Sequence, residues 1–124
     1  MGPLAGLLSA FREDPSCAWL VVAVDMPFLS EETLRWLLER RDPEAFATAF
    51  RNPEIGRPEP ACAIYEPRIL PVLLDAKARG RYSLMLLRDV AVRLVEPIHP
   101  EELTNINDPE EYRKTAGLKL PREG

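Results

Sequence analysis

The stretch that most constrains the fold is the apolar run from Trp19 to Leu29, which reads WLVVAVDMPFL. Every residue from Trp19 to Val24 is apolar, which is typical of a strand that is buried on both faces. Asp25 ends the run and Pro27 cannot continue a central strand, so we expect Asp25 at the strand's carboxyl end. Open α/β sheets bind their ligands at that end, which makes Asp25 the first candidate for chemistry.

Composition narrows the class of protein. A chain of 124 residues that is 46% hydrophobic and 29% charged is expected to fold as one globular domain. The net charge of -4, without a basic cluster, gives no reason to expect a nucleic-acid partner. No apolar segment approaches the roughly 18 residues that cross a bilayer, so we expect no membrane partner and a cytoplasmic location. Cys17 and Cys62 fit no metal or redox spacing and are expected as buried, reduced thiols, and His99 is given no role.

Apolar spacing and capping residues predict an alternation of helices and strands. Leu4, Leu7, Leu8 and Phe11 form one helical stripe, and Ser30 is a good N-cap for a helix that ends near Arg41. Further expected elements are strands at 45–50, 61–65 and 92–95, a surface loop at 51–60, a helix at 69–77, a short helix after Ser83 and a helix start at Asp108. Together they predict an α/β fold that contains a βαβ unit.

Several polar or glycine-containing segments are candidates for a binding site: Asp25, the segment Gly2 to Gly6, Arg57 in its proline-rich loop, and Asn105 with Asn107. Asp25 is of the type that holds Mg²⁺ together with substrate phosphates, and the glycines would allow close approach of a phosphate. Structural roles account for the same residues. Asp25 suits an Asx turn, the asparagines suit turns or caps, and Arg57 suits a solvated loop.

Five segments in order carry a resemblance to a known family. They are Gly2-Pro3-Leu4-Ala5-Gly6, Asp25-Met26-Pro27-Phe28, Arg57-Pro58-Glu59-Pro60, Gly80 to Leu84, and Asn105-Ile106-Asn107-Asp108-Pro109-Glu110-Glu111. In this order the chain resembles the C-terminal two thirds of a molybdenum cofactor guanylyltransferase, which transfers GMP from GTP to molybdopterin. The resemblance implies an α/β, Rossmann-like three-layer nucleotidyltransferase fold that is N-terminally truncated, with a partial domain at 1–118 and a flexible tail at 119–124.

The resemblance also assigns roles to residues. It implies that Asp25 is catalytic and binds Mg²⁺ and the triphosphate, and that the GPLAG segment, through Gly2, Pro3, Leu4 and Gly6, lies at the nucleotide. On the pterin side, the resemblance implies roles for Arg57, Pro60, Asn105 and Asn107. The implied partners are therefore GTP and the molybdopterin cofactor, with Mg²⁺ as the metal.

The sequence lacks several phosphate-binding segments that are typical of the family. The family begins with a strand and a Leu-Ala-Gly-Gly loop, followed by an Arg-Met-Gly segment and a lysine that hold the triphosphate, and none of these is present. The isolated chain is therefore expected to be weakly active or inactive, because those groups stabilise charge on the phosphates. The strand from Trp19 to Val24 is expected to expose an apolar edge, with self-association as the result.

Two alternatives to guanylyl transfer remain open from the sequence. The chain could belong to another nucleotidyltransferase, either a cytidylyltransferase that acts on molybdopterin or a sugar-phosphate enzyme. It could also be a non-catalytic remnant that binds a pterin or a protein.

Overall fold

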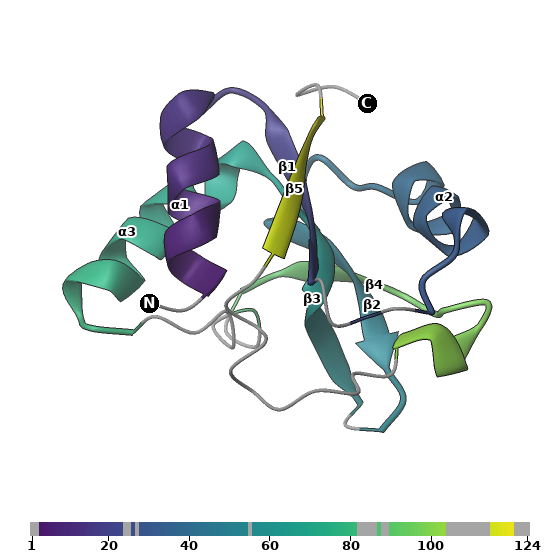
Figure 1. Ribbon diagram of the computed structural model, residues 1–124. Helices are drawn as coiled ribbons and strands as arrows, with labels where there is room; N and C mark the ends of the chain where they lie inside the picture. Colours follow the sequence, from purple (N-terminus) through teal and green to yellow (C-terminus); the bar gives the residue numbers. More distant parts are fainter. Residues whose placement is uncertain are drawn as a thin grey trace.

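A computed structural model describes residues 3–23, 26, 28–54, 56–81, 87, 90–103 and 115–120. Its strands form one mixed sheet in the order β4-β2-β3-β1-β5. The strands are β1 (Ala18–Ala23), β2 (Ala47–Asn52), β3 (Arg57–Tyr65), β4 (Val92–Val95) and β5 (Thr115–Leu120), and the helices are α1 (Pro3–Glu13), α2 (Glu31–Glu39), α3 (Leu70–Ala78) and the short 3-10 helices η1 (Pro67–Ile69) and η3 (Pro100–Leu103). Helices α1 and α3 cover one face of the sheet and α2 the other (Figure 1). The predicted three-layer α/β fold is confirmed.

Strand β1 is an interior strand, as its apolar sequence predicts. It pairs antiparallel with β3 on one side and antiparallel with β5 on the other. The expectation that this strand exposes an unpaired apolar edge is therefore wrong, because β5 covers that edge. The sequence offered no partner for it, since no strand was predicted at 115–120 and residues 119–124 were expected to form a flexible tail.

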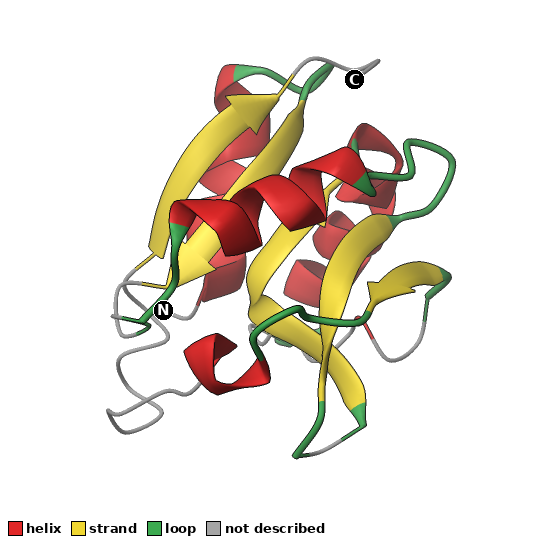
Figure 2. Cartoon of the chain, turned by 90° about the vertical axis from the view of Figure 1, so that its right-hand side faces the viewer, coloured by secondary structure: helices red, strands yellow, loops and turns green. Residues whose placement is uncertain are grey.

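The predicted βαβ unit is present in a modified form. Strand β3 lies between β1 and β2 and runs antiparallel to both, so β1 and β2 are parallel but not neighbours. Strand β4 then pairs parallel with β2 and forms one edge of the sheet. Helix α2 connects the two parallel strands across one face, and Figure 2 shows it lying in front of the sheet.

Two hydrophobic clusters fill the space between the sheet and its helices. Beneath α1 and α3, the predicted stripe of α1 is buried together with Trp19, Tyr65 and Leu73. Beneath α2, the buried cluster contains Leu37, Ile64 and Phe50 with Leu103 of η3. The helical spacing predicted the first cluster correctly, because residues at i, i+3, i+4 and i+7 share one helix face.

The segment 51–60 is a β-hairpin and not the predicted loop. Asn52 pairs with Arg57 across the turn, and Gly56 takes a φ of 67°, which favours glycine. The prolines of the segment argued against a strand, but the pairing of β1 with β3 runs only from Tyr65 to Cys62. Pro58 and Pro60 therefore lie beyond the part of β3 that is paired on both sides, where a missing N–H costs little.

Helix ends follow the predicted capping residues. Ser30 has extended backbone angles and its side chain accepts a hydrogen bond from the N–H of Thr33, which begins α2. Gly80 follows α3 with a φ of 75°, the left-handed conformation expected of a helix stop. Strand β5 extends to Leu120, beyond the predicted domain end at 118. The short helix expected after Ser83 and the helix start at Asp108 fall on residues outside the described ranges, apart from Leu87.

Candidate functional site

The chain brings several candidate segments to one end of the sheet. Strand β1 ends at Ala23, two positions before Asp25 in the sequence. Helix α1 precedes β1 through a short loop, so the start of α1 lies toward the end of β1. Strand β3 is antiparallel to β1, and the segment Arg57 to Ala61 extends past the last pair of that ladder, Val22 with Cys62. The predicted nucleotide and arginine-proline segments therefore reach the same end of the sheet.

Four of the predicted site residues lie outside the described ranges: Gly2, Asp25, Asn105 and Asn107. Of the other residues assigned to the nucleotide, Pro3 begins α1 and Gly6 is exposed on it. The side chain of Leu4 is fully buried in the cluster beneath α1, so only its backbone is left for a ligand.

Two of the four residues assigned to the pterin side, Arg57 and Pro60, lie on the first arm of β3, which is formed by residues 57–61. Arg57 is exposed at the start of the strand, and Pro60 is half-buried with its carbonyl accepting a hydrogen bond of 2.8 Å from the Tyr65 hydroxyl. Between them, Glu59 is 2% exposed and accepts hydrogen bonds from Asn52 Nδ2 at 3.0 Å and the Ala61 N–H at 3.1 Å. These bonds hold the arm that presents Arg57 in a fixed shape.

The buried carboxylate of Glu59 also acts on its neighbours. Burial, followed by the charge of Glu59, raises the pKa of the Cys62 thiol to about 12. The same two causes raise the pKa of Tyr65 above its ordinary range. Both groups therefore stay protonated near neutral pH and are poor nucleophiles. Cys62 is buried as predicted, whereas Cys17 is only half-buried.

The carboxylate of Glu102, which no sequence pattern predicted as functional, forms hydrogen bonds at the start of α2. One oxygen of Glu102, on η3, accepts hydrogen bonds from the Ser30 N–H and the Ser30 hydroxyl, each at 2.9 Å, and from the Thr33 hydroxyl. Burial raises the pKa of Glu102, but the hydrogen bonds from Thr33 and Ser30 outweigh it and the pKa is lowered. Because these residues are about 70 positions apart, no local sequence signal could have revealed the contact.

The contact joins two parts of the chain that carry predicted site residues. Ser30 stands five positions after Asp25 in the sequence, and Glu102 stands three positions before Asn105. A second contact supports the first, since His99 Nε2 lies 2.9 Å from Glu32 Oε1. This hydrogen bond is the largest of the causes that raise the pKa of His99.

No group of three or more His, Cys, Asp or Glu side chains is placed to hold a metal among the residues that the structure describes. Glu102 already accepts three hydrogen bonds from Ser30 and Thr33, so its bonded oxygen is not available as a ligand. Of the helices in the described ranges, none is long and apolar enough to span a membrane.

Comparison with solved structures identifies the class of fold. The structure resembles molybdopterin-guanine dinucleotide biosynthesis protein A from Archaeoglobus fulgidus with a TM-score of 0.67 at 24% identity, covering 90% of this chain and 60% of that one. The chain therefore shares the α/β fold of that protein.

Comparison of sequences identifies the family. The model of the MobA-like NTP transferase domain matches residues 1–98, and the chain belongs to that family. Among curated relatives, a molybdenum cofactor guanylyltransferase from Pseudomonas putida is 35% identical over 112 residues, covering 88% of this chain and 57% of that protein. A molybdenum cofactor biosynthesis bifunctional protein from Synechocystis is 28% identical over 113 residues, covering 90% of this chain and 33% of that protein. The chain thus spans less than two thirds of the length of these relatives.

Proposed function

We propose that the chain forms part of a nucleotidyltransferase, and that this enzyme transfers GMP from GTP to molybdopterin. The observation that supports this proposal is that the start of α1 and the first residues of β3, which include Arg57 and Pro60, reach the same end of the sheet in a member of the MobA-like NTP transferase family. Relatives of this chain are named molybdenum cofactor guanylyltransferases, which supports GTP as donor and molybdopterin as acceptor.

In the proposed reaction, a phosphate oxygen of molybdopterin attacks the α-phosphorus of GTP. A new P–O bond forms, the bond between the α-phosphorus and the bridging oxygen breaks, and pyrophosphate leaves with the electron pair. Catalysis of this step depends on positioning the phosphates and stabilising their charge. The chain's share would be to present the carboxylate of Asp25, which follows β1 in the sequence, and the backbone of Gly2 to Gly6 at the start of α1.

Asp25 would hold the metal in this proposal. Mg²⁺ is commonly held by one or two carboxylates, with substrate phosphates and waters as the other ligands, so a single aspartate after β1 fits it. When bound, Mg²⁺ would neutralise part of the negative charge of the triphosphate. Arg57 and Pro60, at the start of β3, would then face the acceptor together with Asn105 and Asn107.

Calorimetry on this chain tests the proposal. We expect GTP to bind in the presence of Mg²⁺, GTP to bind more tightly than CTP, and Asp25→Asn to weaken binding by about tenfold or more. Asp75→Asn is the matched control, because Asp75 is exposed on α3 and pairs only with Arg79 in the described contacts. Unchanged GTP binding by Asp25→Asn would refute the role of this residue.

The same experiment distinguishes the alternatives. Preference for CTP indicates the cytidylyltransferase, and binding of a sugar phosphate without pterin binding indicates the sugar-phosphate enzyme. Pterin or protein binding without any nucleotide indicates a non-catalytic remnant. An assay that follows transfer of labelled GMP from GTP to molybdopterin then measures how much activity this chain has, which we expect to be weak.

A further inference from the structure

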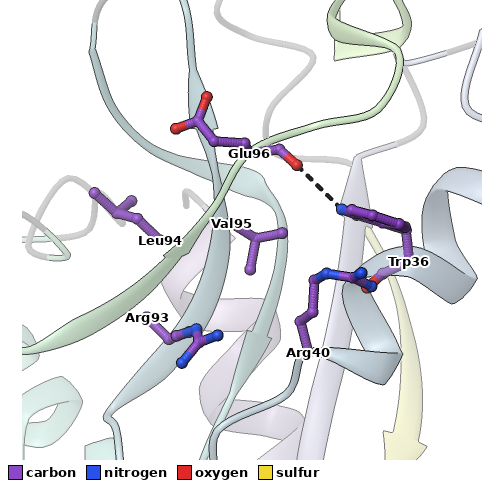
Figure 3. Close-up of a pocket in the computed structure, with 6 residues that line it drawn as sticks. All are labelled: Trp36, Arg40, Arg93, Leu94, Val95 and Glu96. Carbon is purple, nitrogen blue, oxygen red and sulfur yellow. Dashed lines mark hydrogen bonds between the residues drawn. The ribbon is translucent and has the colours of Figure 1, made fainter.

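A small surface pocket lies between α2 and the edge strand β4. It is lined by Trp36 of α2, by Arg40 directly after α2 and by residues 93–96 (Figure 3). Its volume is about 200 Å³, whereas pockets for drug-sized ligands usually measure about 300–1,000 Å³. The pocket therefore suits one side chain or terminal group better than a nucleotide or a pterin.

The pocket carries excess positive charge on a chain whose net charge is -4. The guanidinium of Arg40 stacks on the Trp36 ring, 3.1 Å from its centroid. It donates a hydrogen bond of 3.1 Å to the Trp36 carbonyl and lies 3.7 Å from the carboxylate of the neighbouring Glu39. Arg93 is exposed on β4. The carboxylate of Glu96 is already engaged by Arg51 at 2.7 Å. Arg93 and the remaining N–H groups of Arg40 favour a carboxylate or phosphate, which can accept hydrogen bonds from guanidinium groups.

The backbone beside the pocket is also open to a partner. Strand β4 pairs only with β2, so its other edge is unpaired within the described sheet. The carbonyl of Ala91 accepts a hydrogen bond from Phe46, next to β2. Because backbone groups of successive strand residues alternate in direction, the N–H and C=O of Leu94 point toward the open edge.

The two faces of β4 differ in chemistry. Val95 is buried in the cluster beneath α2, so Arg93, two positions before it, lies on the same face as the pocket. Leu94 lies on the opposite face, and its side chain is 44% exposed. An extended strand added to this edge would place alternate side chains beside the arginines and beside Leu94.

We propose that the open edge of β4 binds an extended acidic peptide segment of a partner protein. The peptide pairs with the backbone at Leu94, seats a carboxylate between Arg40 and Arg93, and alternates acidic with apolar residues. A second copy of this chain is a poorer occupant, because pairing two β4 edges would bring their arginines together, and like charges on paired strands are destabilising. The site does not depend on the proposed guanylyltransferase activity.

A fluorescein-labelled, end-blocked octapeptide that alternates glutamate with valine is the probe. Fluorescence anisotropy should report binding to the chain that weakens as salt is raised, and a peptide with lysine in place of glutamate should not bind. Arg93→Glu should weaken binding at least about tenfold, since it reverses a charge that faces the peptide. Arg79→Glu is the control, because Arg79 is an exposed residue directly after α3, and this variant should change binding less than about twofold. Circular dichroism checks that each variant is folded, and Arg93→Gln serves as the milder substitution.

Several results would overturn the proposal. Absence of peptide binding at millimolar concentration would do so, as would equal weakening by Arg93→Glu and Arg79→Glu. Inorganic phosphate or free glutamate that binds as tightly as the peptide would indicate a small-anion site instead. Dimerisation in analytical ultracentrifugation that is lost in Arg93→Glu would assign the edge to a second copy of the chain.

Discussion

The buried ion pair between Arg41 and Glu66 allows a quantitative prediction. Arg41 follows α2 and Glu66 follows β3, and their side chains are 6% and 1% exposed. Two hydrogen bonds join them, from Arg41 Nε to Oε2 at 2.7 Å and from its terminal nitrogen to Oε1 at 2.9 Å. Arg41→Met would leave the carboxylate buried without this partner, and such a loss costs about 3–5 kcal/mol. A domain is stable by only about 5–15 kcal/mol, so the effect should be large.

Urea unfolding followed by circular dichroism measures this change as a lower midpoint with an unchanged slope. The double variant Arg41→Met with Glu66→Leu should recover most of the loss, because replacing both charges removes the buried unpaired carboxylate. Arg35→Met is the matched control, since Arg35 and Glu31 are 64% and 86% exposed, and it should cost less than about 1 kcal/mol. A loss below about 1 kcal/mol for Arg41→Met, or a double variant no more stable than the single one, would refute this reasoning.

Four further predictions concern the core, the cysteines and pH. Phe11→Ala should lower the free energy of unfolding by about 3–5 kcal/mol, because Phe11 is 0% exposed; a loss under about 1 kcal/mol in urea unfolding would contradict the packing. Iodoacetamide at mildly alkaline pH should label half-buried Cys17 much faster than Cys62, whose thiol pKa burial raises to about 12, and equal labelling in mass spectrometry would count against this. The hydrogen bond to Glu32 raises the pKa of His99, so its stabilisation is full below the unfolded pKa and is lost as pH rises through the folded pKa; His99→Asn should therefore lower the thermal midpoint more near pH 6 than near pH 9. The pKa of Glu102 is lowered, so its contribution to stability is present above the unfolded pKa and is lost as pH falls through the folded pKa. Glu102→Gln should therefore be less stable than the parent chain near neutral pH, and this difference in stability should shrink as unfolding is measured at more acidic pH.

Local patterns in the sequence were enough to place several elements of this fold. The apolar run of β1, the stripe of α1 and the cap at Ser30 were predicted correctly. Each depends on residues within a few positions of one another, where periodicity and capping chemistry act directly. The hairpin was missed for the same reason, since Pro58 and Pro60 are poor strand residues locally and are tolerated only because of their place in the sheet.

The candidate site, like the fold, could be predicted from the sequence only in part. The sequence predicted Asp25 as a candidate because it follows a buried strand. It predicted the start of α1 as a candidate because glycines there would allow close approach of a phosphate. It could not show that Arg57 stands on a strand held by the buried Glu59, because that arrangement depends on the pairing of β2 with β3.

The sequence by itself determined the helices, most of the strands and the buried character of β1, because short-range spacing decides which residues can share a face. The tertiary structure alone decided the order of the strands, with β3 inserted between β1 and β2 and β5 closing the other side of β1. It alone also joined Glu102 to Ser30 and Arg41 to Glu66. The physical reason is that pairing of strands and burial of charge are settled by partners distant in the chain, whose positions no local pattern contains.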